Sequence, residues 1–408
     1  MSNIARTALR GVTYYNPFKA YDGYTLFNAP GLGPILIDVE GNIVHIWRVP
    51  LGYGRLYPNG LLSGNIKHDF SSPDEEGSKP EWRERSEFSG ANDNSELVEI
   101  DWDGNIVWRV RVPYQTHDFF PLDFAPSDKW SQKGKGHYLY LAYHPNGIFS
   151  DELTKKWQGG IAGTEYKERI WGDTIYEIDR DGKIVWEWKT RDHLDPVLDA
   201  FPPLDTRPNF HSNTVFPCRD GTILWSARHL CQIHKIAYSS GEVIRRYGKG
   251  EFFHQHDCKE LPNGNILTLD NGSHRNNFYG PEYSRSVEID PKTGKIVWEY
   301  TADPPSSFYS TVMAGNDRLP NGNTLISDAY DGRFFEVTHE KELVWEYSIP
   351  MWRQRFGATT NMVFRVHRYS KNYPAFKGKD LDPARWKWEN LTYGPPAWKN
   401  REFKPCIF

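Results

Sequence analysis

Six copies of one short pattern, a turn followed by a strand rich in Ile, Val and Trp, are spaced along the 408 residues of the chain. The copies are Gly41–Trp47, Gly104–Trp108, Gly182–Trp188, Gly241–Ile244, Gly294–Tyr300 and Lys341–Tyr347. Most of them follow a strand in which polar and apolar residues alternate, as in Ile175–Asp179. A repeat of this kind constrains the fold strongly, because each unit must stack against its neighbours to bury its apolar face.

A second hairpin precedes this pair of strands in most repeats. Its turns are marked by the dipeptides Asn59–Gly60, Asp220–Gly221, Asn263–Gly264 and Asn321–Gly322. Such dipeptides between alternating segments indicate tight hairpins. Each repeat therefore has four antiparallel strands, which we name A to D in chain order. The sequence predicts an all-β chain folded as a six-bladed β-propeller of four-stranded antiparallel blades.

The first repeat, Tyr21–Trp47, lacks an A strand of its own. The run Asn361–Arg368 near the other end of the chain has the right pattern to supply it. We therefore expect the ring to be closed by pairing of the N- and C-terminal segments, which leaves no open edge. The expected organisation is an N-terminal extension (1–20), the propeller (21–369) and a C-terminal tail packed on it (370–408).

Composition excludes several classes of protein. A formal net charge of -4 does not suit a partner held by phosphate contacts, so no nucleic acid is expected. No apolar run is long enough for a membrane span. Residues 1–10 lack the apolar core of a secretory signal, so we expect a cytoplasmic protein, or a periplasmic one if a signal has been removed. The cysteines show no CxxC spacing and indicate neither a zinc site nor a redox motif. The oligomeric state is not predicted.

Histidines recur at the start of the A strands. His256 stands six residues before Pro262 and His211 six residues before Pro217, which predicts equivalent positions on adjacent blades. His117 stands in the corresponding place of the preceding repeat. In a propeller the A strand lies nearest the axis, and A and B are antiparallel. We therefore expect the three histidines to meet at one mouth of the central channel.

The ends of the B strands should lie at the same mouth. Seven residues after the turn glycines Gly60, Gly136, Gly221 and Gly264 stand Lys67, Tyr143, Arg228 and Asn271, and His68 and His144 follow the first two. Imidazoles, a guanidinium, an ammonium and amides with few carboxylates predict an anion site. The expected ligand is a small aromatic or anionic substrate. Its predicted contacts are Lys67, His68, Tyr143, His144 and Asn271.

Two long connections, 69–94 and 145–172, are expected to cover this mouth, since loops of such length are usually functional. They contain Trp82, Trp157 and Tyr166. These rings either grip an aromatic or sugar ring or simply pack the loops, and the sequence leaves both readings open.

Together, His117, His211–Asn213, Ser226–Arg228, Gln255–Asp257 and the Leu-Pro-Asn-Gly-Asn turn resemble the bacterial arylsulfate sulfotransferase (arylsulfotransferase) family. The resemblance extends over about Tyr21 to Tyr369. It implies a six-bladed propeller that moves a sulfuryl group between phenols without a nucleotide sulfate donor. It further implies that His256 is transiently sulfated, that His117 and His211 are partner histidines, and that Asn213 and Arg228 bind sulfate.

The chemistry suits these residues on its own terms. Sulfuryl transfer has a loose transition state with charge on the equatorial oxygens, which Arg228, Asn213 and a protonated His211 are expected to stabilise. A neutral imidazole at His256 attacks sulfur. His117 protonates the departing phenolate and later deprotonates the acceptor. Asp257 or a more distant carboxylate is expected to fix the tautomer of His256. No cofactor is required.

Two alternatives stay open at this point. His117, His211 and His256 also suit one divalent metal such as Mn, Zn or Fe. With Arg228, Lys67 or a tyrosine as base, such a site would act as a lyase, by β-elimination on a uronate or an aryl ether. The second alternative is a non-catalytic propeller that serves as an interaction module.

Overall fold

The computed structural model describes residues 10–67, 95–131, 134–143, 145–157, 169–202, 209–275, 280–355 and 358–395. These residues form two compact units. Unit 1 comprises residues 1–64, 100–106 and 312–408, and unit 2 comprises residues 65–99 and 107–311.

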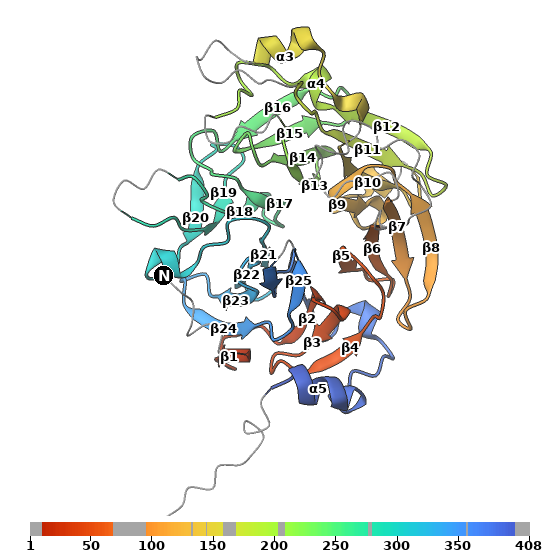
Figure 1. Ribbon diagram of the computed structural model, residues 1–408, viewed down its shortest axis with the longest axis vertical. Coiled ribbons are helices and arrows are strands. Elements are labelled where there is room, and N and C mark those ends of the chain that lie inside the picture. The colour runs from red at the N-terminus through yellow and green to blue at the C-terminus, as the bar shows by residue number, and fades with distance from the viewer. Residues whose placement is uncertain are drawn as a thin grey trace, which may run out of the picture. The chain divides into compact units, whose positions relative to one another are not determined.

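Unit 2 contains three complete four-stranded antiparallel sheets, each with its strands in chain order. The first holds β9 (Gln115–Pro121), β10 (Tyr138–Ala142), β11 (Thr174–Ile178) and β12 (Ile184–Lys189). The second holds β13 (Ser212–Pro217), β14 (Thr222–Ala227), β15 (Gln232–Ala237) and β16 (Val243–Tyr247). The third holds β17 (His256–Glu260), β18 (Ile266–Asp270), β19 (Arg285–Ile289) and β20 (Ile296–Tyr300). Figure 1 shows β13 to β16 side by side in this order.

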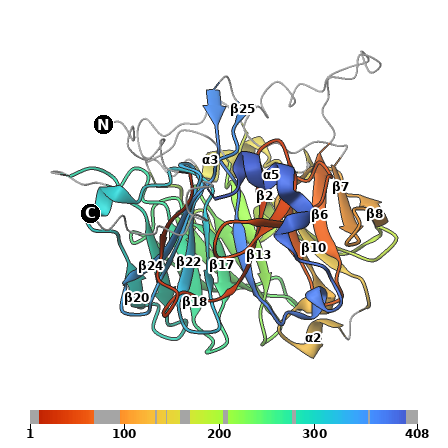
Figure 2. The same ribbon diagram turned by 90° about the horizontal axis from the view of Figure 1, so that it is seen from below.

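Unit 1 contains two sheets that combine distant parts of the chain. One has the order β27 (Val366–Ser370), β2 (Gly23–Ala29), β3 (Gly33–Ile37), β4 (Ile43–Ile46). The other has the order β21 (Gly315–Arg318), β22 (Thr324–Asp328), β23 (Arg333–Val337), β24 (Leu343–Ser348), β1 (Gly11–Tyr15). A separate hairpin, β25 (Arg353–Arg355) and β26 (Ala358–Thr360), projects from this unit in Figure 2.

The remaining sheet has the order β5 (Tyr53–Leu56), β6 (Leu62–Lys67), β7 (Ser95–Ile100), β8 (Ile106–Arg111). With it, the described residues form six four-stranded antiparallel blades, and the predicted six-bladed β-propeller is confirmed. The pairing of chain ends is confirmed as well, because β27 pairs with β2. The C-terminal strand begins at Val366 rather than at Asn361. Within the N-terminal extension, β1 adds to β24 as a fifth strand.

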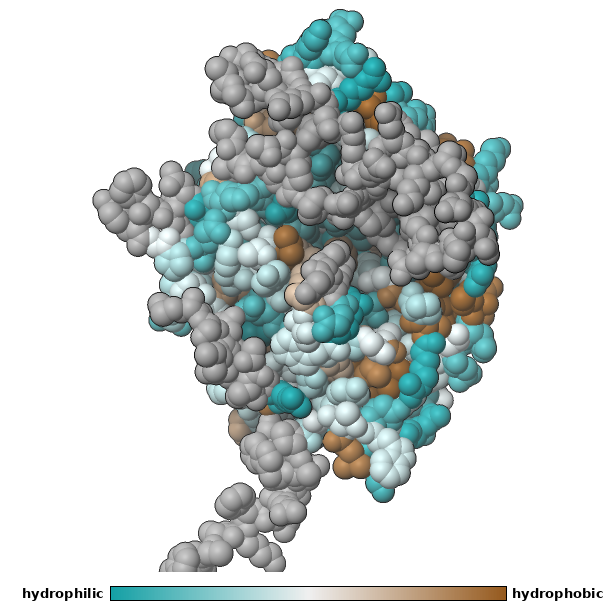
Figure 3. All heavy atoms as spheres, in the orientation of Figure 1, coloured by the Kyte–Doolittle hydropathy of each residue, from teal (hydrophilic) through white to brown (hydrophobic). Residues whose placement is uncertain are grey.

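Helices are few and short in the residues that the structure describes. They are α2 (Asp128–Ser131), α3 (Asp151–Trp157), α4 (Thr190–His193) and α5 (Lys387–Tyr393), with 3-10 turns at Leu122–Phe124, Pro145–Gly147, Pro305–Ser307, Pro374–Phe376 and Pro383–Trp386. In unit 2, α2 and α3 lie at opposite ends of the strands (Figure 2). Hydrophilic side chains cover the surface over α3 (Figure 3), where Lys156 pairs with Glu152. None of the helices in the described residues is long and apolar enough to cross a membrane.

The repeated tryptophan of the D strand has a structural explanation. Its indole N–H donates to a backbone carbonyl near the C–D turn of the following blade. Within the units these pairs are Trp47 with Asp101 (3.0 Å), Trp108 with Arg180 (3.0 Å), Trp186 with Tyr238 (3.1 Å) and Trp345 with Val39 (2.7 Å). The donor of a buried indole needs such a partner. The repeated tryptophan of the sequence motif therefore links neighbouring blades through a hydrogen bond.

The tail of unit 1 also contacts a blade directly. The side chain of Asn390 accepts from the backbone N–H of Ile43 at 2.7 Å and donates to the carbonyl of Ile43 at 2.9 Å. Trp386 donates from its indole to the carbonyl of Val44 at 3.0 Å. The described part of the tail thus pairs with the outer strand β4, whose edge it covers.

Arg368 on the closing strand β27 is fully enclosed by unit 1. Its guanidinium pairs with Glu336, lies 4.1 Å from the ring centroid of Trp345, and donates to Thr25 at 2.9 Å. Removal of one partner from a buried pair leaves an uncompensated charge, which costs about 3 to 5 kcal/mol. We therefore expect Arg368→Leu to lower the free energy of unfolding by that amount, measured from urea-unfolding midpoints.

Lys371→Ala is the matched control. Lys371 pairs with Asp22 at 2.7 Å, but both side chains are about half exposed, and such pairs contribute about 0 to 1 kcal/mol. Equal midpoint shifts for the two variants would contradict the role assigned to Arg368.

Candidate active site

In unit 2, the first strand of each complete sheet carries a β-bulge near its start. In β13 the register shifts between Ser212 and Thr214, and in β17 between His256 and Lys259. A bulge inserts an unpaired residue and turns nearby side chains. Left-handed φ angles stand beside these bulges at Tyr114 (61°), His117 (38°), His211 (52°), His254 (64°) and Asp257 (57°). Backbone of this kind is costly for non-glycine residues and is concentrated at functional sites.

Phe210 and Phe253 occupy equivalent positions in their sheets. The carbonyl of each accepts a hydrogen bond from a backbone N–H that follows the second strand of its own sheet. The next residues, His211 and His254, therefore correspond to each other, and both have a left-handed backbone.

His256 thus corresponds to Asn213, and the prediction that His256 and His211 are equivalent is wrong. The error comes from the prolines used for counting. Pro217 is the last residue of β13 and pairs with β14, whereas Pro262 lies in the turn beyond β17. Relative to the hairpin turns of their sheets, the two prolines stand two residues apart. The two histidines counted from them are therefore also two residues apart.

The histidines nevertheless gather in one place. A continuous row of ring contacts runs through unit 2, with centroid distances of 5.9 Å for Tyr143–His117, 4.7 Å for His117–His211, 4.9 Å for His211–His229, 5.9 Å for His229–His254 and 5.0 Å for His254–His274. His274 is exposed and His117 and His211 are partly exposed, while His229 and His254 are buried. The row therefore reaches solvent at more than one point.

His211 lies among positive and titratable groups. Desolvation by the surrounding protein lowers the pKa of His211 well below its ordinary value, and the nearby His117, His229 and Arg228 lower it further. The neighbouring His256 acts in the same direction. His211 is therefore neutral at pH 7, which corrects the expectation of a protonated ring.

The protonation of His256 follows from its neighbours. The amide nitrogen of Asn271 donates to the carbonyl of Ser310 at 2.7 Å, and this fixes the orientation of the amide. Oδ1 of Asn271 then faces Nδ1 of His256 at 2.7 Å, and the carbonyl of His254 lies 3.1 Å from the same nitrogen. Both are acceptors, so Nδ1 carries the hydrogen and the lone pair of the neutral ring is on Nε2.

Gln255, just before His256, is held by the neighbouring sheet. Its side-chain nitrogen lies 3.1 Å from Oγ of Ser226, 3.1 Å from the carbonyl of Ala227 and 2.7 Å from that of Gln232. Its own carbonyl accepts from the amide of Asn213 at 2.7 Å. The start of β17 is thereby fixed against β13, β14 and β15.

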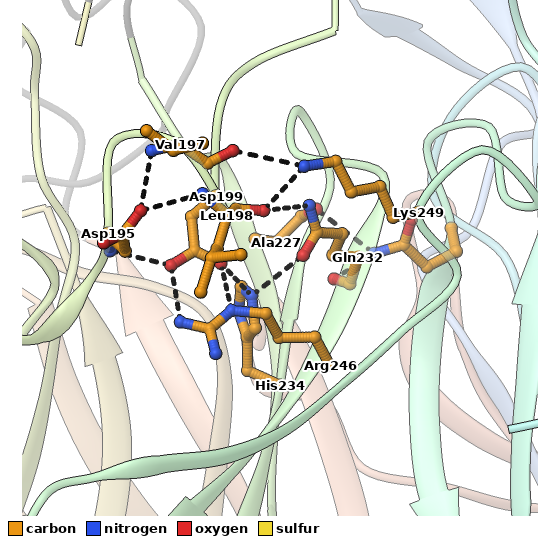
Figure 4. A network of polar contacts seen from close by, with 10 residues as sticks. Asp195, Val197, Leu198, Asp199, Ala227, Gln232, His234, Arg246 and Lys249 are labelled. Carbon is orange, nitrogen blue, oxygen red and sulfur yellow. Dashed lines mark hydrogen bonds and ion pairs between the residues drawn. The ribbon is translucent and has the colours of Figure 1, made fainter. Parts of the chain in front are cut away.

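A buried ionic network lies next to the residues that hold Gln255 (Figure 4). Asp199 accepts from Nε and Nη2 of Arg246 at 2.6 and 2.8 Å, and its Oδ1 lies 2.9 Å from Nε2 of His234. His234 also contacts Oε1 of Gln232 at 3.2 Å. Burial opposes ionisation of Asp199, but the hydrogen bonds from Arg246 and His234 outweigh it and hold the pKa of Asp199 well below its usual range. The network holds the side chain of Gln232, whose backbone carbonyl accepts the hydrogen bond from Gln255.

Two predicted site residues have partners other than those expected. Asn213 is buried, with its amide on the Gln255 carbonyl and its oxygen accepting from Thr214 at 3.0 Å. The carboxylate of Asp257 pairs with Lys259 at 2.9 Å. The tautomer of His256 is thus set by an amide and a backbone carbonyl rather than by a carboxylate. The predicted contact of Asn213 with sulfate stays a prediction.

Several expectations concern residues beyond those described. His68, His144, Trp82 and Tyr166 lie outside the described residues, and of Lys67 only the backbone in β6 is described. Trp157 is described and is buried in a core cluster with Phe149 and Phe210. Its ring packs the protein interior, which decides between the two readings of this residue.

Tyr309, which lies near Arg228, and its partner Glu282 were not predicted from the sequence. Tyr309 donates its hydroxyl to Glu282, and burial together with this bond raises the pKa of Tyr309 to about 12. The positive charge of Arg228 acts on the same phenol. Glu282 also accepts from the backbone N–H of His274. Both residues lie in connections outside the repeated strands, so no periodic signal marks them.

With this geometry described, the chain can be compared with known families. The sequence pattern of the family described as arylsulfotransferase (ASST) matches residues 88–349. The chain belongs to the arylsulfotransferase family. The matched part contains His117, His211, Arg228, His256 and Asn271, and the catalytic and binding roles of these residues remain predictions. Lys67 and His68 precede the matched part.

Other comparisons give distant likenesses. A comparison with curated proteins finds no significant relative. Similar solved structures include a protein of unknown function from Bacteroides caccae, with 13% identity over 85% of this chain and 98% of that one and a TM-score of 0.48. A periplasmic gluconolactonase of Pseudomonas aeruginosa has 10% identity over 86% and 99%, with a TM-score of 0.43. Virginiamycin B lyase from Staphylococcus aureus has 14% identity over 81% and 87%, with a TM-score of 0.39. These proteins differ in function, and none of their functions is carried over to this arylsulfotransferase-family chain.

The alternative of a metal at His117, His211 and His256 requires side chains arranged to coordinate an ion. In the part of the chain that the structure describes, no three His, Cys, Asp or Glu side chains are arranged to hold a metal ion. The metal-dependent lyase stays an alternative prediction, with a direct test given below.

The neutral state of His211 has a consequence for stability. Because its pKa is lower in the folded chain than the value of about 6.5 in the unfolded chain, unfolding takes up a proton below about pH 6.5. Stability contributed by the neutral ring is therefore full above that pH and is lost as the pH falls, with a limiting slope of about 1.4 kcal/mol per pH unit. We expect His211→Gln to show a shallower loss of unfolding free energy than the wild type between about pH 6.5 and 4.5. Parallel curves over this range, measured by urea unfolding, would rule out this contribution.

Proposed function

We propose that the chain transfers a sulfuryl group from an aryl sulfate to a phenolic acceptor through a covalent intermediate on Nε2 of His256. The observation that carries the proposal is the 2.7 Å contact between Nδ1 of His256 and Oδ1 of Asn271. It sets the tautomer of the neutral imidazole, with the hydrogen on Nδ1 and the lone pair on Nε2, and this tautomer can attack sulfur through Nε2. Membership of the arylsulfotransferase family supports the reaction class.

In the first half-reaction Nε2 of His256 forms a bond to sulfur, and the bond between sulfur and the aryl oxygen breaks. The oxygen leaves as a phenol after taking a proton from His117, whose Nδ1 lies 2.7 Å from the hydroxyl of Thr116. The sulfated ring still carries the Nδ1 hydrogen and is cationic. The carbonyl oxygens of Asn271 and His254 face that hydrogen, so they stabilise the charge as it develops.

In the second half-reaction the acceptor phenol gives its proton to His117 and attacks sulfur. The bond between nitrogen and sulfur breaks, and His256 returns to its neutral form. General acid–base help of this kind contributes about 10²- to 10⁴-fold to a rate. His117 is suited to both steps because it is partly exposed and lies in ring contact with His211.

The sulfuryl oxygens need positive or hydrogen-bonding partners throughout. Arg228 supplies a permanent positive charge close to His211, since it contributes to the lowered pKa of that ring. A neutral His211 donates one ring hydrogen to an oxygen, and it takes up a proton more readily once an anion lies between it and Arg228. The charge needed for an anion is thus concentrated beside the nucleophile.

The covalent step has a direct test. After brief exposure to 4-nitrophenyl sulfate without acceptor, we expect mass spectrometry to find a sulfated peptide that contains His256. His256→Ala should lose this adduct and all turnover while keeping its fold, whereas His339→Ala, at an exposed turn, should keep both. An active His256→Ala enzyme would end the proposal. A β-elimination activity on a uronate or an aryl ether that is lost on dialysis against a chelator and restored by a divalent metal would favour the lyase instead.

Asn271 offers a second, more specific test. Asn271→Leu removes the acceptor that fixes the tautomer, and a wrong tautomer lowers turnover by up to about 10⁴-fold in a comparable catalytic histidine. We expect a loss of about 10²- to 10⁴-fold in kcat with little change in KM. Asn271→Asp keeps an acceptor oxygen and should lose less. Equal activity of the leucine variant and the wild type in single-turnover sulfation would contradict this role.

A further inference from the structure

A chain of acid–base groups lies in unit 1. Oη of Tyr53 lies 2.8 Å from Nε2 of His367, and Nδ1 of His367 lies 2.7 Å from Oδ2 of Asp317. Tyr53 is on β5, His367 on β27 and Asp317 on β21, each an edge strand of its sheet. None of the three belongs to the site described above.

The position of each hydrogen in this chain is determined by its partners. Asp317 as a carboxylate only accepts, so Nδ1 of His367 donates to it. Nε of Arg55 lies 3.4 Å from Nε2 of His367 and can only donate, which leaves the lone pair of the ring on Nε2. Nη2 of Arg55 donates to Oη of Tyr53 at 3.0 Å, so the phenol hydrogen points to His367.

This order matches a nucleophile, a base and an orienting carboxylate, which is the logic of a catalytic triad with a phenol in place of an alcohol. Transfer of the phenol hydrogen to His367 gives a phenolate between the imidazolium and the Arg55 guanidinium. The imidazolium in turn faces Asp317, so opposite charges alternate along the chain. Such an arrangement lowers the cost of forming the phenolate.

The positive side chains around Tyr53 favour an anionic substrate. The Arg365 guanidinium lies 5.5 Å from the ring centroid of Tyr53 and 4.8 Å from that of Phe364, which adds a second positive group beside Arg55. Tyr53 is 5% exposed, while Arg55 is partly exposed and the Asp317 side chain is 20% exposed. The phenol is therefore recessed, with two guanidinium groups near it.

We propose that Tyr53, His367 and Asp317 form a second reactive centre, in which the Tyr53 phenol attacks an anionic ester held by Arg55 and Arg365. In the step, Oη bonds to the acyl carbon as its hydrogen passes to Nε2 of His367. The bond from that carbon to the leaving oxygen breaks, and the leaving group takes the hydrogen from His367. The centre does not depend on sulfuryl transfer at His256.

Acetylsalicylate, an anionic aryl ester, is the probe. At neutral pH, peptide mass spectrometry should find Tyr53 acetylated at least about 10²-fold faster than Tyr14 and Tyr330, which are 44% and 48% exposed and serve as internal controls. His367→Gln should remove this advantage, and Asp317→Asn should reduce it by about 10-fold or more. Circular dichroism confirms that each variant is folded, and the conservative Asp317→Asn keeps the test valid if His367→Gln is not.

Two further arms separate the parts of the proposal. With neutral phenyl acetate, Tyr53 should react more slowly than with acetylsalicylate, and Arg55→Leu should abolish that preference. His256→Ala should leave Tyr53 labelling unchanged, which separates this centre from sulfuryl transfer. Labelling of Tyr53 no faster than that of Tyr14, or unaffected by both His367→Gln and Asp317→Asn, overturns the proposal. Equal rates for the two esters overturn the anionic substrate class.

Discussion

The contact on which the blades depend is the hydrogen bond from the D-strand indole to a carbonyl of the following blade. It joins Trp108 to Arg180 and Trp186 to Tyr238 in unit 2, and Trp345 to Val39 in unit 1. A four-stranded sheet has two edges and two apolar faces. An isolated sheet could bury neither its edges nor its faces adequately. The indole provides apolar area for the face and a polar donor for the turn beyond it. The same residue therefore explains both the sequence repeat and the cohesion of neighbouring sheets.

Fixed outer strands allow irregular inner ones. In unit 2 the bulges and left-handed residues are found at the starts of β9, β13 and β17, where the histidines stand. The hydrogen bonds of the Gln255 side chain and the Asp199 network next to them hold the irregular start of β17 in place. Strain at the site is compatible with the fold because regular, well-paired strands surround it.

The fold was predictable because period, turn residues and strand alternation all pointed to one architecture. The gathering of His117 and His211 followed from the same reasoning. The exact register did not, because bulges add residues without a sequence signal and because Pro217 and Pro262 look alike in the chain. The neutral state of His211 and the role of Asn271 depend on neighbours far apart in sequence, such as Arg228 and Ser310. Tyr309 and Glu282 belong to irregular connections, where no repeat reports their position.

The choice of an amide at Asn271 has a consequence for how the orientation of His256 responds to acidity. A carboxylate in this place would gain a proton in acid and cease to hold the imidazole hydrogen. A carboxamide has no such equilibrium, so the grip on Nδ1 of His256 is the same in mildly acidic and mildly alkaline solution. Only the imidazoles themselves then respond to acid, and the orientation of the His256 ring does not change with pH.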